Sequence, residues 1–291
     1  MCTIAESINI MSKTIGPAIR EREKGPIQKM AAEELAAGSD IIDLNLGPAR
    51  KAGDEMMAWL VNVVQEVKKD VRLALDTTNS VAIAAGLKVC NERAIVNSVS
   101  AHPTSLAERI PLIKQFDADF VALTMSEEGI PRDANERAVA LSTIMAAAEE
   151  AGIPNERYWV DPIVLPVSVD IGQVKSYMEF LPMVPAIVPG ATNTCGLSNV
   201  SNGAPDHLRP ILNQVYLMML YTLGQESAIV DAYDKNMMDL CQGKRAAEVE
   251  MIRKLMNGEA VTATTDAEKV TLKTFRVLNG DVLYSHSWLE D

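Results

Sequence analysis

The chain has 291 residues, of which 48% are hydrophobic and 23% charged, with 16 glycines and 14 prolines. This composition excludes a disordered, fibrous or low-complexity protein, and the length is sufficient for a substantial buried core. Because 39 acidic residues oppose 27 basic ones, for a net charge of −12, we expect no nucleic-acid partner.

Nothing in the sequence predicts a signal peptide or a membrane span. The first nine residues lack a basic start and a long apolar run, and the longest uncharged stretch, residues 180–205, contains four prolines. The cysteines form no CxxC pair, so we expect neither a zinc site nor a disulfide framework; they are Cys2, Cys90, Cys195 and Cys241. A cytoplasmic location without an intrinsic metal is the expectation.

Eight short apolar runs, separated by amphipathic stretches, predict strands. In chain order they are Thr3–Asn9, Ile41–Leu46, Leu73–Thr77, Ala94–Ser98, Phe120–Met125, Tyr158–Ile163, Thr192–Leu197 and Ala228–Asp231. Several are nearly continuous apolar runs, as is typical of strands buried on both faces. The intervening stretches have helical spacing, most plainly at Ile27–Ala37, Met56–Val67 and Leu208–Leu223.

Eight βα units in a chain of this length predict a (β/α)8 TIM barrel, a fold that takes ~250 residues. A doubly wound open sheet is the alternative, but it usually has fewer strands, and no GxGxxG loop follows the first strand here. We expect a single domain, with the barrel over residues 1–257. The more polar residues 258–291 are expected to form a C-terminal extension packed outside the barrel.

Polar side chains follow nearly every predicted strand. In chain order they are Glu6 and Asn9, Asp43 and Asn45, Asp76 and Asn79, Asn97, Thr124 with Ser126 and Glu127, Asp161, Ser198 and Asn199, and Asp231. Any one of them is most simply a turn or helix-capping residue. Since the active sites of such barrels gather at the carboxyl ends of the strands, the whole ring predicts a binding site.

The ring contains no lysine, arginine or histidine, which disfavours a phosphate or carboxylate ligand at its centre. Carboxylates accept hydrogen bonds, and carboxamides both donate and accept them. This set suits the edge of a neutral heterocycle that carries adjacent N–H donors and a carbonyl. A divalent cation held by converging carboxylates is the alternative that these residues leave open.

Seven segments together resemble the pterin-binding methyltransferases, which move a methyl group between methyltetrahydrofolate and the cobalt of a corrinoid protein. The segments are IAESIN (Ile4–Asn9), IIDLNLGP (Ile41–Pro48), LALDTTN (Leu73–Asn79), AIVNSVS (Ala94–Ser100), VALTMSEEGIP (Val121–Pro131), WVDPIVLP (Trp159–Pro166) and GLSNVSNG (Gly196–Gly203). The family fold is a (β/α)8 barrel. Members often read GERxN at the first strand, so this chain lacks that arginine.

The resemblance implies which residues contact the substrate. The expected pterin-binding residues are Asp76, Asn97, Asp161, Gly196, Ser198 and Asn199. Of these, Asn199 matches the residue near pterin N5 and is the expected catalytic group. A carboxamide there donates a hydrogen bond as the methyl–N5 bond breaks, and a positioned donor of this kind is worth ~10²-fold or more in rate.

Other residues are expected to assist. An amide is a poor acid, so the proton for N5 is expected from solvent or from a water held by a carboxylate. Glu6 and Asp43 are the candidates for this relay, with Asn9 beside them. Asn202 and Arg209 are candidates for a loop that holds the substrate.

The resemblance also implies the cofactors and partners. Tetrahydrofolate or methyltetrahydrofolate is the substrate, in an acetogenic or demethylating one-carbon pathway. Proteins that bind a corrinoid through histidine usually show DxHxxG, which Asp206-His207-Leu208 does not match. We therefore expect the corrinoid on a separate protein that docks at the barrel mouth, and a homodimer as in other family members.

Several alternatives remain. A dihydropteroate synthase-like enzyme shares the barrel but uses a basic residue in the loop after strand seven, where this chain reads LSNVSN over residues 197–202. A non-catalytic pterin-binding protein is distinguished by turnover, and a metal-dependent lyase by chelation. Methyl transfer to a thiol needs a zinc-bound thiolate, for which the cysteines and histidines lack the spacing.

Overall fold

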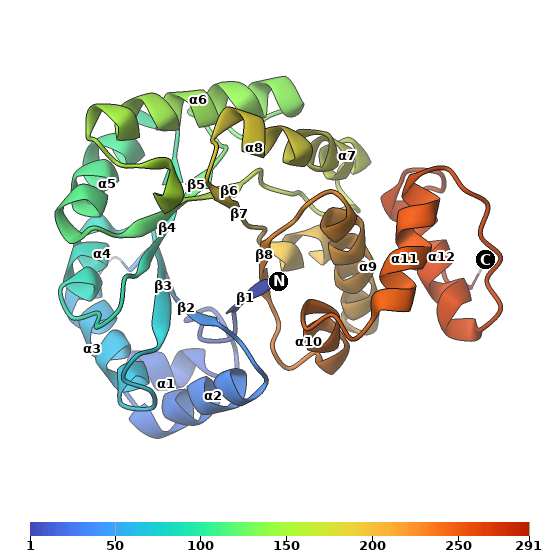
Figure 1. Ribbon diagram of the computed structural model, residues 1–291. Helices are drawn as coiled ribbons and strands as arrows, with labels where there is room; N and C mark the ends of the chain where they lie inside the picture. Colours follow the sequence, from blue (N-terminus) through green and yellow to red (C-terminus); the bar gives the residue numbers. More distant parts are fainter. Residues whose placement is uncertain (50, 291) are drawn as a thin grey trace.

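The computed structural model describes residues 1–49 and 51–290 and confirms a (β/α)8 TIM barrel (Figure 1). Its strands are β1 (Cys2–Ala5), β2 (Ile41–Gly47), β3 (Arg72–Thr77), β4 (Ile95–Ser100), β5 (Asp119–Leu123), β6 (Tyr158–Asp161), β7 (Thr192–Asn193) and β8 (Ser227–Val230). All neighbouring strands pair in parallel, in the order β7-β6-β5-β4-β3-β2-β1-β8. The doubly wound alternative is thereby excluded.

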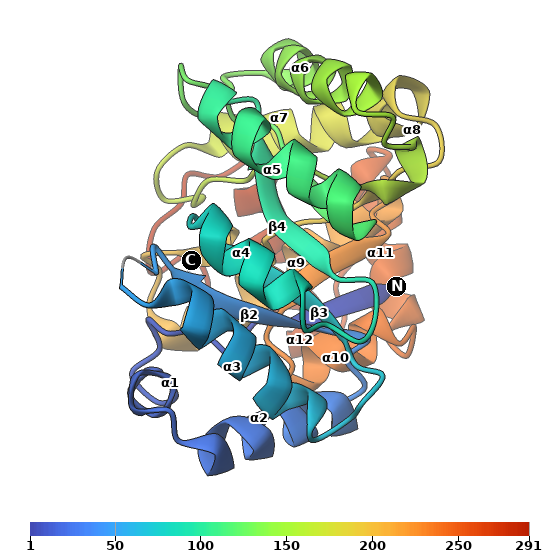
Figure 2. The ribbon, with the colours of Figure 1, turned by 90° about the vertical axis from the view of Figure 1, so that its left-hand side faces the viewer.

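The helices lie outside this sheet. They are α1 (Gly16–Glu21), α2 (Lys24–Ala36), α3 (Gly53–Gln65), α4 (Ser80–Leu87), α5 (Pro103–Phe116), α6 (Ala134–Glu150), α7 (Ile171–Phe180), α8 (Val184–Ile187), α9 (Arg209–Thr222), α10 (Lys235–Cys241), α11 (Ala246–Met256) and α12 (Asp266–Leu278). Figure 2 shows α3, α4 and α5 covering the outer side of β2, β3 and β4. None of the described helices is both long and apolar enough to cross a membrane.

A ring of apolar side chains fills the inside of the barrel, with one member from each of six strands. They are Ile4, Ile41, Ala74, Ile95, Val121 and Trp159, all buried. Successive side chains of a strand point to opposite faces, so residues two positions before or after this layer also point inward. The layer thus separates two polar ends of the barrel.

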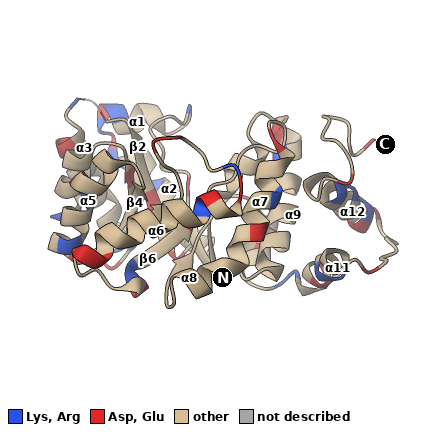
Figure 3. Cartoon of the chain, turned by 90° about the horizontal axis from the view of Figure 1, so that it is seen from above, with Lys and Arg blue, Asp and Glu red and all other residues tan. Residues whose placement is uncertain are grey.

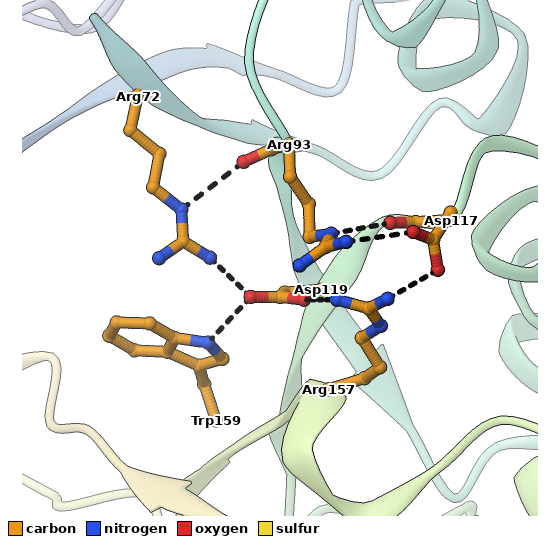
Figure 4. A network of polar contacts seen from close by, with 6 residues as sticks. All are labelled: Arg72, Arg93, Asp117, Asp119, Arg157 and Trp159. Atoms are coloured by element: carbon orange, nitrogen blue, oxygen red, sulfur yellow. Dashed lines mark hydrogen bonds and ion pairs between the residues drawn. The ribbon is translucent and has the colours of Figure 1, made fainter.

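At the amino-terminal ends of the strands, the barrel is closed by a network of ion pairs and hydrogen bonds (Figure 4). Buried Asp119 accepts from Arg72, from Arg157 Nη1 (3.3 Å) and from the indole of Trp159 (3.4 Å). Arg157 and Arg93 also pair with Asp117, at 2.6 and 2.8 Å. Charged groups at this end are therefore bound to one another, which is consistent with a structural role.

The first and the seventh strand show the largest differences from the predicted bounds, since each ends four residues earlier than expected. The strand predicted over Thr3–Asn9 ends at Ala5, because the next segment leaves the ladder and the Ser7 amide donates to Glu34 Oε1 (3.0 Å). The strand predicted over Thr192–Leu197 ends at Asn193. There side chains replace the ladder: Asn193 Nδ2 donates to the Gly224 carbonyl (3.0 Å) and its Oδ1 accepts from the Glu226 amide (2.8 Å).

The barrel closes between β7 and β8 at a single bridge. Gly196 pairs with Ile229, and the Ile229 amide donates to the Cys195 carbonyl (2.8 Å). Beyond Gly196 the chain turns into a short 3-10 helix, η3 (Leu197–Ser201). The loop that carries Asn199 therefore lies directly at this seam.

The C-terminal helices lie to one side of the barrel. Both α11 and α12 contact α9, and Figures 1 and 3 show them outside the ring of strands. The side chains of Phe275, Leu278 and Trp288 are buried in the cluster around α9. In the view of Figure 3, lysine, arginine and acidic residues are scattered over the outer elements rather than gathered in one stripe.

Candidate active site

A cavity of about 1160 Å³ opens at the carboxyl ends of the strands. Its floor is lined by polar residues from six strands or the turns that follow them: Glu6, Asp43 and Asn45, Asp76, Asn97, Asp161 and Asp231. Each lies two or four residues after an inward-facing residue of its own strand, so the alternation of the strand aims it into the barrel. The rim adds Met11, Lys29 and Tyr233 from loops and α2.

Four of these residues form two hydrogen-bonded pairs. Asn97 Nδ2 donates to Asp43 Oδ1 (3.1 Å), and Asn45 Nδ2 donates to Asp76 Oδ2. Burial raises the pKa of Asp76 to about 6, although nearby Arg109 opposes the shift. Burial, and then the Asp76 charge, hold the pKa of Asp43 well above its ordinary range. A hydrogen-bond donor on a bound ligand would therefore change the protonation, and hence the charge, of these two floor carboxylates.

Asp161 is held by two backbone amides. Its Oδ1 accepts from Ile163 (2.8 Å) and its Oδ2 from Gly196 (3.2 Å). Burial raises its pKa to about 6, and these two hydrogen bonds lower it in part. The carboxylate is therefore fixed in direction, with lone pairs remaining for a ligand in the cavity.

Asn199 lies above Asp161 at the mouth. A Cβ on Gly196 would be 3.1 Å from Asn199 Nδ2 and 3.8 Å from Asp161 Oδ2, so the amide donor and the carboxylate flank the same glycine. Asn199 Oδ1 accepts from Asn202 Nδ2 (3.3 Å), and Asn202 Oδ1 accepts from Arg209 Nη2 (3.2 Å). With its oxygen bound to the loop, Asn199 presents its NH₂ group as a donor.

A second group of carboxylates lies on the β1 side. Ser198 Oγ donates to Glu6 Oε1 (2.5 Å), and burial raises the pKa of Glu6 to about 7. Glu34 on α2 accepts from the Ser7 amide through Oε1, while its buried Oε2 has no partner among the described residues. Burial raises the pKa of Glu34 to about 7 as well. Of these two carboxyl groups with a raised pKa, that of Glu6 adjoins the Asn199 loop.

The structure brings nearly all of the predicted site residues to this one cavity. Those that line it are Glu6, Asn9, Asp43, Asp76, Asn97, Asp161, Gly196, Ser198, Asn199 and Arg209. Asn202 does not line the cavity but contacts both Asn199 and Arg209. Asn9 accepts from the Met11 amide (2.8 Å), which shapes the loop at the rim. Asn79 caps α4.

Sequence reasoning missed three buried charged residues next to the floor: Glu34, Arg109 and Arg137. Each lies on the apolar stripe of its helix; Arg137, for example, precedes Ala140, Leu141 and Ile144 at helical spacing. A charged residue on a stripe that packs against the sheet must be paired or hydrogen-bonded. A charged residue at an apolar position of the helical pattern is therefore the sequence signal by which these three residues could be found.

The site has the donors and acceptors that a flat heterocycle requires. Among residues 1–49 and 51–290, no cluster of three or more His, Cys, Asp or Glu side chains has the arrangement to hold a metal ion. Carboxylates and carboxamides instead alternate around the floor and reach one wall of the mouth at Asn199. They can accept from ring and exocyclic N–H groups, and the amides can donate to a carbonyl.

Comparison with known proteins gives concordant matches. Residues 20–231 match the sequence profile of the family described as pterin binding enzyme. The methylcorrinoid:tetrahydrofolate methyltransferase of Eubacterium limosum is 26% identical over 240 residues, which cover 82% of this chain and 88% of that protein. A methionine synthase of Mycobacterium tuberculosis (strain ATCC 25618 / H37Rv) is 26% identical over 264 residues, covering 82% of this chain but only 22% of the synthase. A solved dihydropteroate synthetase with a bound product has a TM-score of 0.64 at 16% identity, over 84% of this chain and 94% of that one, a likeness of fold.

Proposed function

The chain belongs to the pterin binding enzyme family, and from that premise we propose that it moves a methyl group between N5 of methyltetrahydrofolate and the cobalt of a separate corrinoid protein. The names of its methyltransferase relatives support methyl transfer. The observation that carries the proposal is the placement of Asn199, which lines the cavity with its oxygen bound to Asn202 and its Nδ2 beside Gly196.

In this proposal the floor of the cavity holds the pterin. The ring carries N–H donors along one edge and a carbonyl, and Asp76, Asn97 and Asp161 complement them. Because these side chains come from β3, β4 and β6, they meet the ring edge from three directions. Their existing partners, Asn45 on Asp76 and two backbone amides on Asp161, keep them oriented before the substrate arrives.

Asn199 assists the transfer itself. The electron pair of the N5–methyl bond goes to N5, which gains a proton, while the Co(I) electron pair forms the new cobalt–carbon bond of methyl-Co(III). A neutral tertiary amine is a poor leaving group, so a donor at N5 lowers the barrier as charge develops there. The reverse direction, from methyl-Co(III) to tetrahydrofolate, uses the same contacts.

Glu6 is the proposed proton source. It is buried, its pKa is raised to about 7, and it accepts from Ser198, the neighbour of Asn199. A carboxyl group with this pKa carries a proton for much of the time at neutral pH and can pass it through a water. Asp43, on the floor, is the second candidate. Asn9 shapes the loop beside them.

The corrinoid partner is proposed to dock over the mouth. The rim carries two exposed apolar side chains, Met11 (71% exposed) and Tyr233 (50% exposed). The corrinoid must reach a methyl group held beside Asn199, and the mouth gives the direct approach. Arg209 is already bound by Ser198, Ser201 and Asn202 of the loop, so it is a poor receptor for the anionic second substrate of a synthase.

The test is an anaerobic mixture of the protein with methyltetrahydrofolate and Co(I) corrinoid, followed by cobalt absorption. We expect loss of the Co(I) band, growth of a methyl-Co(III) band, and a rate about 10²-fold lower for Asn199→Ala. Tetrahydrofolate should still bind to this variant, with a loss of affinity smaller than the loss of rate. If neither free corrinoid nor a corrinoid protein is methylated although the pterin binds, the methyltransferase proposal is wrong.

A further inference from the structure

We propose that two buried arginines, Arg109 and Arg137, are positioning residues for the pterin site. They hold the strand ends that carry Asp76, Asn97 and Asp161. The inference rests on the proposed function, because the ligand whose binding they support is the pterin.

Arg109 extends from α5 toward the ends of two neighbouring strands. Its Nη2 donates to the Thr77 carbonyl (3.1 Å) and its Nη1 to the Ser98 carbonyl. These residues directly follow Asp76 and Asn97. One guanidinium therefore binds the backbones immediately beyond two of the three residues proposed to hold the pterin on the floor.

Arg137 has the corresponding place at β6. Its Nε donates to the Pro162 carbonyl (2.8 Å) and its Nη2 to the Ile163 carbonyl (3.1 Å). Ile163 has a φ of +56°, a strained value for a β-branched residue, and its amide donates to Asp161 Oδ1. Arg137 thus supports the turn whose amide orients Asp161.

The remaining donors of Arg137 bind the neighbouring helix and loop. They reach Ser176 Oγ (2.6 Å), Gln173 Oε1 (2.9 Å) and the Asp133 carbonyl (3.2 Å). The side chain is completely buried. It is therefore anchored on α7 and on the start of α6 while it holds the β6 turn.

Stability alone is a weak reason for these two cations. Asp76 and Asp161 lie near enough to act on their charges, but among the described residues neither arginine is in ion-pair contact with a carboxylate, and buried Arg109 Nε has no hydrogen-bond partner. A buried cation without a carboxylate in contact costs desolvation energy, which apolar side chains of similar volume avoid. Each guanidinium group instead donates two hydrogen bonds, in a fixed geometry, to backbone carbonyls next to the proposed pterin contacts.

The test compares four variants with a matched control. Arg109→Met and Arg137→Met remove the guanidinium but keep an unbranched chain, and Arg109→Lys and Arg137→Lys keep the charge. Arg157→Met removes a part-buried arginine of the network at the opposite end of the barrel. For each protein, tetrahydrofolate binding is measured by calorimetry, methyl transfer by cobalt absorption, and folding by circular dichroism and thermal unfolding.

We expect the Met variants to bind tetrahydrofolate about tenfold more weakly or worse, with kcat at saturating substrate changed by less than about threefold. The Lys variants should lie between these and the wild type. Arg157→Met should lower the unfolding temperature without changing tetrahydrofolate affinity. A purely structural role predicts instead that affinity follows stability in all variants, the control included.

Unchanged tetrahydrofolate affinity in the Met variants, or an equal loss in Arg157→Met, overturns the positioning role. If the Met variants do not fold, unchanged affinity in both Lys variants also overturns it. Failure of the wild-type protein to bind tetrahydrofolate is a separate result, because it contradicts the proposed function itself.

Discussion

The orientation of one amide, that of Asn199, follows from a residue that can only donate. The Arg209 guanidinium has no acceptor, so the Asn202 oxygen faces it and the Asn202 NH₂ faces Asn199. Asn199 must then accept through its oxygen, which leaves its NH₂ group to act as the donor. Arg209 therefore determines, through Asn202, the orientation of the amide that we propose to be catalytic.

Replacing Asn202 by aspartate should reverse the orientation of the Asn199 amide. A carboxylate accepts from Arg209 but also from Asn199 Nδ2, which turns the Asn199 oxygen toward N5. We expect Asn202→Asp to lower kcat about tenfold while KM for methyltetrahydrofolate changes little. Asn202→Gln, which keeps both a donor and an acceptor, is the control. Wild-type kcat in Asn202→Asp would contradict the assignment.

The raised pKa of Glu6 predicts how the rate of methyl transfer depends on pH. Its pKa is raised to about 7 by burial, and a general acid acts only while protonated. The rate of transfer from methyltetrahydrofolate should therefore fall as pH rises through about 7. In Glu6→Gln, the rate should be lower and this fall should be lost. A pH profile that is the same in the variant and the wild type would exclude Glu6 as the proton source.

At the scale of elements, α12 connects the C-terminal extension to the barrel. Thr265 accepts from the Glu268 amide (3.2 Å), and Glu268 accepts in return from the Thr265 amide (2.9 Å), a capping box. Phe275 and Leu278 of the same helix are buried in the cluster around α9. We propose that residues 258–291 and the barrel unfold as one unit.

Removing the cap tests this proposal. Thr265→Ala should lower the free energy of unfolding by about 1 kcal/mol and shift a single urea transition. Methyl transfer should be unchanged, because α12 lies outside the barrel. Thr262→Ala, at an exposed position three residues earlier, controls for loss of a nearby hydroxyl outside the cap. An early separate transition in Thr265→Ala would mean that the extension unfolds independently.

At the scale of the whole molecule, raised carboxyl pKa values concentrate at one end of the barrel. Burial raises the pKa of Asp76 and Asp161 to about 6 and that of Glu6 and Glu34 to about 7. For such groups the folded state binds protons more tightly than the unfolded state. Their contribution to stability is fully present below the unfolded pKa, near 4, and is lost as pH rises to about 7.

We therefore expect the free energy of unfolding to fall between pH 5 and pH 7. One such group contributes a slope of at most about 1.4 kcal/mol per pH unit. The fall should be shallower in Glu6→Gln. In Glu179→Gln, which changes an exposed residue of α7, it should equal that of the wild type. Denaturant titrations at several pH values measure this, and a stability that rises over this interval would contradict the assigned shifts.

The sequence predicts the architecture well because the apolar runs and their spacing recur eight times. It also predicts which side chains line the cavity, since strand alternation aims residues such as Asp76 and Asp161 into the barrel. It fails where side chains replace backbone contacts, as Asn193 does at the end of β7. It also fails for Arg109 and Arg137, whose partners are backbone carbonyls that only the folded chain brings near.

The single bridge between β7 and β8 has a consequence for motion. Every other neighbouring pair of strands shares at least two paired positions, whereas here Gly196 and Ile229 meet alone. Local opening is least costly where few backbone hydrogen bonds must break, so the Ile229 amide should exchange with solvent sooner than amides in β3 or β4. The same seam carries Asn199, so we expect its widening to displace this proposed partner of N5 while the residues of the floor keep their positions.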